Sequence, residues 1–529
     1  MRNFERLNKF IDGRYFSEII MLVLFFGVSI LIFMKSYFGG AYISPDSTNY
    51  LRAAQSILNG YGFRVYAEAG WNYLYFSHWP IGYPFLIACV SFITKTDVYL
   101  ASKILTILTL AGIFGLLYQW FKKKAWIYAL IMVCYPSFLT CFYYTWSEQL
   151  FLFGSLLLTF EIINIISENK PKLYHYFSIL IACLLMFFVR YVGIQTIGII
   201  GLVIIYFITV QIITKKSTLE KIIPLTVVVV VVSAVISGYF YLNYVNTGHI
   251  TGDNSVHPRG SFNSLRYILE STIHLCRGQI EEASKIFQIS FIQTLSAFVI
   301  MIFIFFQFKC SFKIKQLPLN ALVLLIMSIF YVFAFLFFRA VTEVDQHYER
   351  HLLSSTILFA FYCIAIFLEN KDDIFVEIRQ FLQKRKVLSV CVLFVWFGAY
   401  PLREYTKSLI GFAKGTNVSY QQTKNEIINE LSSVPSKSII MTDYSHSKEF
   451  FASFIRTDLF VTGGYETCID KYIELLNKFN NANNANNVYI YLDTEYVIPD
   501  CYDRAQNTEE NLMLKDYLFS RKDKLIKVK

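Results

Sequence analysis

Residues 16–63 read FSEIIMLVLFFGVSILIFMKSYFGGAYISPDSTNYLRAAQSILNGYGF, an apolar run followed by an amphipathic one. The apolar part, 16–34, has about 20 residues, enough to cross a bilayer. The amphipathic part predicts a helix that Ser44 caps, that has Pro45 in its first turn and that ends at Gly60. Its apolar residues recur at helical spacing with polar residues between them. This pattern is typical of a helix lying flat on a membrane surface.

One acid, Asp46, lies at the start of this amphipathic helix. A carboxylate at such a place can meet both a lipid headgroup and a water-soluble substrate. Asp46 is therefore a candidate general base that takes a proton from an acceptor hydroxyl. The alternative is a structural acid that favours the helix dipole and caps amide groups. Arg52, on the polar side of the same helix, is a candidate for a supporting role.

The composition of the whole chain agrees with a membrane protein. Of its 529 residues, 55% are hydrophobic and only 16% are charged, and the mean hydropathy is +0.46. Aromatic residues reach 18%, which suits lipid-facing helices and interfacial belts. The net charge of +10 comes from Lys and Arg in short loops, so we interpret it as a signal of orientation and not of nucleic-acid binding. These values predict a polytopic α-helical membrane protein.

Further apolar runs follow the first one, and together they predict about 11 spans. The later runs lie at 98–121, 125–143, 147–166, 174–189, 192–213, 222–243, 289–308, 319–338, 352–368 and 387–401. The run at 81–94 is short and contains Gly82 and Pro84, so it fits a re-entrant or interfacial piece. If it does not cross, all basic clusters fall on the side where the chain starts. We therefore expect a retained first span, a cytoplasmic N-terminus and an extracytoplasmic C-terminus.

Two domains are expected. Residues 1–401 form a multi-span membrane domain, whose first outer loop is 37–97, and residues 402–529 have a soluble composition. In the second part, SKSIIMTDYS, DLFVTGG and NVYIYLD predict strands, and CIDKYIELLNKF predicts a helix. We expect a small extracytoplasmic α/β domain, in which Cys468 and Cys501 either pair or stay free.

Two more residues on the expected outer side are candidates for binding. His78 lies in the stiff aromatic run SHWPIGYP. It either binds a phosphate or sugar hydroxyl or is a structural residue of the interface. Glu148 lies at the outer end of a span, after Trp146 and Ser147. It either supports the acceptor site or is a solvated helix start, because an acid at that shallow depth costs little.

Basic residues dominate the remaining candidates. Arg190 and Tyr191 lie between two apolar runs. Arg350 and His351 begin a later span, and Arg259 lies in a long outer loop. A guanidinium group matches a lipid phosphate because its planar fork makes bidentate hydrogen bonds. The alternative is that these side chains snorkel at helix ends.

Several kinds of site are missing from the sequence. It has no phosphate-binding loop, and no spacing of its ten cysteines demands a metal. Within the predicted spans we expect essentially no charged residue at mid-depth, and no inverted repeat is apparent. These absences disfavour an ion-coupled transporter.

Five short motifs and their order carry a family resemblance. They are SPDSTNYLRAAQSILNGYGF, YFSHWPIGYPFLIA, YTWSEQLFLFGSLLL, FVRYVG and ERHLLSS. With them the chain resembles the GT-C class of membrane glycosyltransferases, and most of all the branch of protein O-mannosyltransferases and the lipid A aminoarabinose transferase. The resemblance implies that Asp46 is the catalytic base. Many relatives have a second acid directly after it, where this chain has Ser47, and some have Lys where this chain has His78.

The resemblance also implies a mechanism at the outer face of the cell (inner) membrane. The donor is a sugar on a polyprenyl phosphate, and the acceptor is an envelope glycan, lipid or protein. Asp46 deprotonates the acceptor, the lipid phosphate leaves with inversion, and Arg190, Arg350 and His78 stabilise it. Such a monophosphate donor needs no obligatory metal or cofactor. Two alternatives stay open: a carrier or flippase for lipid-linked saccharides, and a polysaccharide polymerase or ligase with a diphosphate-linked donor.

Overall fold

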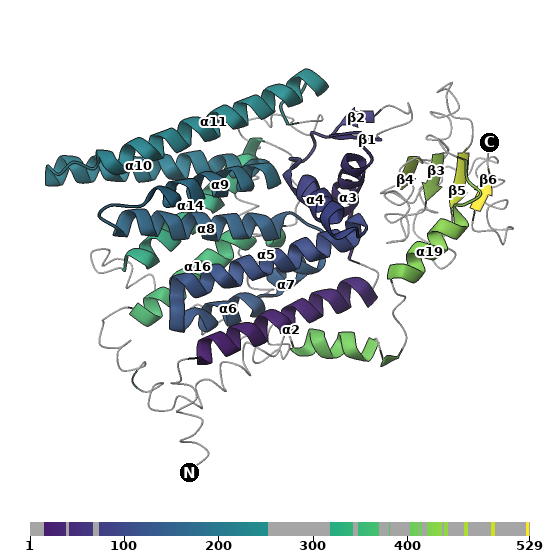
Figure 1. Cartoon of the computed structure of the whole chain (residues 1–529), viewed down its shortest axis with the longest axis horizontal. Helices are drawn as coiled ribbons and strands as arrows, with labels where there is room; N and C mark the ends of the chain where they lie inside the picture. The colour runs from purple at the N-terminus through teal and green to yellow at the C-terminus, as the bar shows by residue number, and fades with distance from the viewer. Residues whose placement is uncertain are drawn as a thin grey trace, which may run out of the picture. The chain divides into compact units, whose positions relative to one another are not determined.

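A computed structural model of the chain is mostly helical and divides into two compact units (Figure 1). The first unit comprises Met1–Ile32, Ser77–Tyr83 and Lys103–Ile410. The second unit comprises Phe33–Phe76, Pro84–Ser102 and Gly411–Lys529. The residues that the structure describes are 15–38, 42–66, 73–251, 318–341, 348–369, 380, 402–411, 413–414, 420–435, 439–442, 460–463, 488–491 and 525–527.

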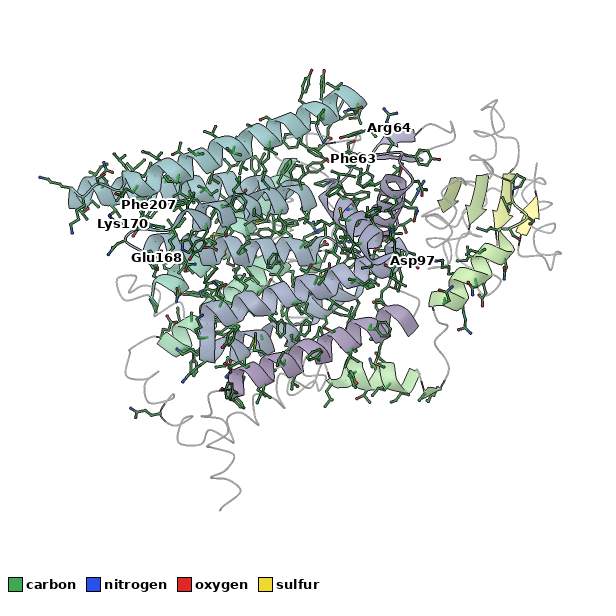
Figure 2. The ribbon with its side chains drawn as sticks, viewed as in Figure 1. Phe63, Arg64, Asp97, Glu168, Lys170 and Phe207 are labelled. Atoms are coloured by element: carbon green, nitrogen blue, oxygen red, sulfur yellow. The ribbon has the colours of Figure 1, made fainter. Side chains whose placement is uncertain are left out.

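The first unit is a bundle of apolar helices that lie side by side, with side chains filling the space between them (Figures 1 and 2). It holds most of α2 (Phe16–Phe38) and of α5 (Val98–Phe121). Its other helices are α6 (Ala125–Cys134), α7 (Pro136–Tyr143), α8 (Glu148–Ser167), α9 (Leu173–Val189), α10 (Gln195–Thr214), α11 (Leu219–Thr247), α14 (Leu319–Val341), α15 (Tyr348–His351) and α16 (Leu353–Glu369). The most extensive packing is between α8 and α9 and between α14 and α16.

Six stretches of the described helices are long and apolar enough to cross a membrane. They are Phe16–Ser36, Val98–Cys134, Glu148–Ser167, Tyr191–Thr214, Leu219–Thr247 and Leu319–Phe337. The runs expected at 174–189 and 352–368 form the shorter apolar helices α9 and α16, each of 17 residues. Two further expected spans, 289–308 and 387–401, lie outside the described residues. The expected number of 11 and the orientation of the termini therefore stay predictions.

The span expected at 125–143 is wrong as a single helix. The structure divides it into α6 and α7, with Tyr135 extended between them (φ −78°, ψ 118°). The reason is Pro136, the first residue of α7. Proline has no N–H to donate to the preceding turn, and it disfavours the helical conformation at the residue before it.

The short run at 81–94 forms helix α4 (Gly82–Thr94), with 13 residues. Its length of about 20 Å falls short of the roughly 30 Å of a bilayer core, as its sequence predicts. The start of this helix packs tightly in the first unit. A Cβ on Gly82 would lie 2.6 Å from the carbonyl oxygen of Phe188, so only glycine fits this contact.

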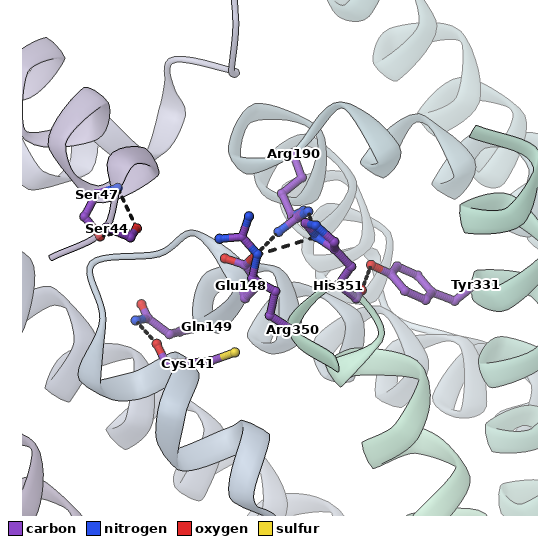
Figure 3. Close-up of polar contacts among 9 residues, drawn as sticks. All are labelled: Ser44, Ser47, Cys141, Glu148, Gln149, Arg190, Tyr331, Arg350 and His351. Atoms are coloured by element: carbon purple, nitrogen blue, oxygen red, sulfur yellow. Dashed lines mark hydrogen bonds and ion pairs between the residues drawn. The ribbon is translucent and has the colours of Figure 1, made fainter. Parts of the chain in front are cut away.

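In the second unit, the amphipathic helix forms as the sequence predicts: α3 spans Pro45–Leu58. The hydroxyl of Ser44 accepts a hydrogen bond from the backbone N–H of Ser47 at 3.2 Å, and Pro45 fits the first turn (the Ser44–Ser47 contact is drawn in Figure 3). Gly60 takes a φ of +82° after the helix end. Beyond it, a two-stranded antiparallel pair forms from β1 (Arg64–Tyr66) and β2 (Tyr73–Tyr75). This pair of strands was not predicted from the sequence.

The C-terminal part of the second unit contains a four-stranded sheet in the order β4-β3-β5-β6. The three predicted strands are confirmed as β3 (Ile439–Thr442), β4 (Phe460–Gly463) and β5 (Val488–Tyr491), with β3 parallel to both neighbours. The strand β6 (Leu525–Lys527) pairs antiparallel with β5 and was not predicted. The predicted helix CIDKYIELLNKF, Cys468 and Cys501 lie outside the described residues. A separate extracytoplasmic domain beginning at 402 stays a prediction.

Helix α19 (Tyr420–Glu430) connects this part of the second unit with the turn before α5. The Nζ atom of Lys424 lies 3.2 Å from Oδ2 of Asp97, which Figure 2 labels. Both side chains are partly exposed, so the pair adds at most about 1 kcal/mol.

Candidate active site

Glu148 is the first residue of helix α8 and is buried, with 6% of its surface exposed. A carboxylate is favoured at a helix N-terminus because the backbone N–H groups and the dipole there are positive. The residues before it, 144–147, make the turn that separates α7 from α8. The solvated helix start considered from the sequence is therefore wrong, since Glu148 lies inside the bundle.

Arg190 directly follows helix α9, in an extended conformation (φ −153°, ψ 132°). The short 3-10 helix η2 (Tyr191–Ile194) then turns the chain into α10. This turn is close-packed on the end of α9. A Cβ on Gly193 would lie 2.4 Å from the carbonyl carbon of Met186, so glycine is required there. The turn thereby fixes where the side chain of Arg190 leaves the backbone.

Arg350 and His351 lie at the end of α15, just before α16. Their position is tied to α14 by two contacts. The hydroxyl of Tyr331 donates a hydrogen bond to the carbonyl oxygen of His351 at 2.7 Å. The ring of Phe335 stacks against the imidazole, with centroids 5.7 Å apart.

The structure brings four of the predicted residues together around one carboxylate (Figure 3). Oε1 of Glu148 accepts a short hydrogen bond from Nη1 of Arg190. Nε of Arg350 and Nδ1 of His351 each lie 3.9 Å from the same oxygen. Nη2 of Arg190 lies 2.5 Å from Nδ1 of His351. We call Glu148, Arg190, Arg350 and His351 the Glu148 cluster.

The hydrogen bonds decide the charge of the Glu148 cluster. A guanidinium group only donates, so Nδ1 of His351 accepts from Arg190 and the proton of this neutral imidazole is on Nε2. These four side chains contribute two guanidinium charges and one carboxylate charge. Because the four side chains are 82% or more buried, these charges are screened only weakly by solvent. The cluster is suited to bind an anion.

Tyr191, also expected to bind the donor, has a different place. Its hydroxyl donates to the carbonyl oxygen of Ser77 at 2.6 Å and accepts from Nδ2 of Asn243 at 3.1 Å. These contacts join η2 to α11 and to the segment that contains His78. The side chain of His78 is exposed, and its ring meets that of Trp79 edge-on, with centroids 4.0 Å apart.

The other predicted residues lie elsewhere. Asp46 is in the first turn of α3 in the second unit and is partly exposed. Arg52, on the same helix, is partly buried, and burial lowers the pKa of its guanidinium to about 10, so it stays charged at neutral pH. Arg259 lies outside the described residues. The roles of these three residues stay predictions.

Two ionisable residues are buried in apolar helices. Lys103 lies in α5 and Glu161 in α8, and each is 5% exposed. Nζ of Lys103 donates to the carbonyl oxygen of Tyr143 at 2.6 Å, and Oε2 of Glu161 lies 2.5 Å from Nδ1 of His175. Each lies within about two turns of one end of its helix, so the expectation of essentially no charge at mid-depth stays a prediction.

Among the described residues, no three or more His, Cys, Asp or Glu side chains are grouped as metal ligands would be. That the protein needs no metal stays a prediction.

Comparison with known proteins gives matches in structure only. No known family profile matches the chain, and no curated protein matches it in sequence. It is similar to ArnT from Cupriavidus metallidurans in the apo state, at 12% identity, with 90% of this chain and 93% of that chain covered and a TM-score of 0.53. It is also similar to the apo oligosaccharyltransferase of Archaeoglobus fulgidus, at 11% identity, with 90% and 69% covered and a TM-score of 0.51.

The chain has a GT-C fold. The expectation drawn from five short motifs is thus confirmed for the fold, which extends over nine-tenths of the chain. Another solved structure with this GT-C fold is ArnT from Cupriavidus metallidurans bound to undecaprenyl phosphate, at 11% identity, with 90% and 93% covered and a TM-score of 0.50. At identities this low, a match shows a shared arrangement of helices but not a shared chemistry. The chemistry must be argued from the residues of the Glu148 cluster.

Proposed function

We propose that the chain is an inverting glycosyltransferase that moves a sugar from a polyprenyl-phosphate donor to a cell-envelope acceptor. The observation that carries this proposal is the Glu148 cluster, which gathers two buried guanidinium groups and an imidazole in a membrane bundle of GT-C fold. The complex of ArnT with undecaprenyl phosphate, which shares the fold, supports the choice of a lipid phosphate as the ligand. The acceptor class is a glycan, lipid or protein of the envelope.

The charge of the cluster fits the donor that we propose. A sugar linked through one phosphate to a lipid is a phosphodiester with a single negative charge. When the bond between the anomeric carbon and the phosphate oxygen breaks, the leaving phosphate gains negative charge. In this proposal Arg190 and Arg350 stabilise that charge by hydrogen bonds that strengthen as it develops. The neutral His351 would donate from Nε2.

Asp46 is the residue that we assign as the base. It takes the proton of the acceptor hydroxyl, whose oxygen forms the new bond to the anomeric carbon from the face opposite the phosphate. One bond forms as the other breaks, so the configuration inverts. Ser47 follows Asp46 where many GT-C relatives have a second acid, so the chain provides one carboxylate at this step.

Glu148 has a supporting role in this proposal. By accepting from Arg190 and lying near Arg350, it orients two like-charged groups that would otherwise repel each other. His78, Arg52 and Arg259 are proposed as further contacts to donor or acceptor. We also propose that the reaction takes place at the outer face of the inner membrane, with a cytoplasmic N-terminus, and that it needs no metal.

The experiment is a transfer assay with purified protein in detergent. It offers a panel of polyprenyl-phosphate sugars together with envelope extract, and it compares wild type with Asp46→Asn and, as a matched control on another acid, Asp97→Asn. We expect Asp46→Asn to abolish transfer while the control keeps it, and we expect NMR of the product to show inversion. Retained transfer by folded Asp46→Asn would remove Asp46 as the base, and no transfer from any monophosphate donor would contradict the proposed reaction.

The buried Lys103 and Glu161 favour a second candidate, a carrier or flippase for lipid-linked saccharides. This candidate predicts movement of the lipid-linked sugar across liposomes without formation of a glycosidic bond. A polymerase or ligase with a diphosphate-linked donor stays a third candidate.

A further inference from the structure

The turn at 144–147, between α7 and α8, is fixed by one side chain from α5 and one from the start of α8. The carbonyl oxygens at the end of a helix have no partner within it. Here Nζ of Lys103 donates to the carbonyl oxygen of Tyr143 at 2.6 Å. Nε2 of Gln149 donates to those of Cys141 at 2.7 Å and Tyr144 at 3.0 Å (Figure 3 draws the Cys141 contact).

In this turn the ring of Trp146 contacts Tyr144 and Arg350. The ring of Tyr144 stacks on it almost in parallel, with centroids 4.3 Å apart and planes at 9°. Cζ of Arg350 lies 4.7 Å from the centroid of the Trp146 ring. Tryptophan has the strongest cation–π attraction of the aromatic side chains, and the attraction grows when the cation is desolvated. The side chain of Arg350 is 12% exposed, so this condition is met.

We propose that Trp146 is a positioning residue, which holds the guanidinium of Arg350 in the Glu148 cluster ready for a lipid phosphate. The proposal rests on the proposed function, because it assumes that the cluster binds a lipid phosphate. Its physical basis is the geometry of the contact. A cation–π contact acts through the charge of the guanidinium, so it is compatible with N–H groups of Arg350 donating to a carboxylate or a phosphate. Glu148, whose Oε1 lies 3.9 Å from Nε of Arg350, and Trp146 then both contribute to the orientation of this side chain.

The experiment measures the Kd of undecaprenyl phosphate for the full chain in detergent, with uncharged undecaprenol as the reference ligand. The variants are Trp146→Leu, Trp146→Phe, Arg350→Gln and the double variant Trp146→Leu/Arg350→Gln. The matched control is Trp120→Leu, which removes another stacked tryptophan, one that packs on Phe121 and Phe160. Thermal unfolding of each variant shows whether it is folded.

We expect Trp146→Leu to raise the Kd of undecaprenyl phosphate roughly tenfold and Trp146→Phe to raise it less, because phenylalanine keeps part of the cation–π attraction. In the Arg350→Gln background, Trp146→Leu should raise the Kd by less than about twofold, since its effect passes through Arg350. Trp120→Leu and binding of undecaprenol should be unchanged.

Two outcomes would overturn the inference while leaving the proposed function intact. One is an equal loss on Trp146→Leu with and without Arg350, which would show a structural effect. The other is an Arg350→Gln variant that binds weakly beside Trp146→Leu and Trp146→Phe variants that bind as wild type does. If Trp146→Leu does not fold, the same comparison is made with Trp146→Phe and with the double variant Trp146→Phe/Arg350→Gln. If the wild-type chain binds undecaprenyl phosphate no better than undecaprenol, the proposed function fails, and the inference with it.

Discussion

The two ends of the α8–α9 pair are both polar, but they are assembled from different parts of the chain. At one end, Glu148 opens α8 and Arg190 follows α9, while Arg350 and His351 come from a segment much further along. The hydrogen bond between Arg190 and His351 spans 161 residues of sequence. Three separate segments therefore have to meet to form the Glu148 cluster.

The contacts at the opposite end of the pair span at most 56 residues of sequence. Nδ1 of His175, near the start of α9, lies 2.5 Å from Oε2 of Glu161, only 14 residues away, and its Nε2 lies 3.4 Å from Oε1 of Glu168. Nζ of Lys221 donates to the carbonyl oxygens of Ile165 and Glu168. These contacts close the hairpin, whose turn includes the labelled Glu168 in Figure 2.

The two ends of the α8–α9 pair differ in their charged groups, and this difference indicates which end binds a ligand and which end only stabilises the fold. The Glu148 cluster has two guanidinium groups beside one carboxylate, and guanidinium groups suit an anion. The Glu161 end has two carboxylates around one imidazole, and the ammonium group of Lys221 there donates to backbone carbonyl oxygens, so this end is less suited to a phosphate. From this contrast we expect substitutions at the first end to impair ligand binding and those at the second end to lower only the stability of the fold.

The largest effect is expected for Arg190→Gln, which leaves Glu148 buried without its closest partner. Breaking a buried ion pair costs about 3–5 kcal/mol, and loss of a charged hydrogen bond to the ligand lowers affinity roughly 100-fold. Thermal unfolding and titration with undecaprenyl phosphate measure the two effects. The double variant Glu148→Gln/Arg190→Gln removes both charges, so it should regain stability but not affinity. If that double variant bound undecaprenyl phosphate as tightly as wild type, the Glu148 cluster would not be the binding end of the α8–α9 pair.

A smaller effect, on stability alone, is expected for Glu161→Gln. A buried hydrogen bond to a charged group contributes about 1.5–3 kcal/mol, so the unfolding temperature should fall. Sugar transfer by the folded variant should stay within about twofold of wild type. Loss of transfer at an unchanged unfolding temperature would show that this end also takes part in function.

The smallest effect is expected for Lys424→Gln, which removes the partly exposed pair with Asp97 in the second unit. Solvent screens such a pair, so the free energy of unfolding should change by less than about 1 kcal/mol. The measurement is thermal unfolding at low and high salt, and the small difference between wild type and variant should shrink in high salt. If Lys424→Gln lost as much unfolding free energy as Glu161→Gln, the exposure of an ion pair would not predict its contribution to stability.

Local features of the fold were predictable because a few neighbouring residues determine them. Helix α3 begins and ends where Ser44, Pro45 and Gly60 predict, and three strands of the C-terminal sheet lie where their β-branched and aromatic runs predict. Pro136 also indicates the break between α6 and α7 in the sequence. The prediction of one span at 125–143 missed this break because it used hydropathy alone. The short strands β1, β2 and β6 were missed because three residues give no periodicity to read.

The sequence by itself determined the membrane class of the chain, the helix with Asp46 and a set of basic residues suited to phosphate. It could not tell which of them meet. Only the tertiary structure decided that Arg190 joins Glu148 and His351 while its neighbour Tyr191 turns to Ser77 and Asn243. The physical reason is range: caps and turns depend on contacts a few residues apart, whereas a convergent charge cluster depends on how α8, α9 and α16 pack, which no local pattern encodes.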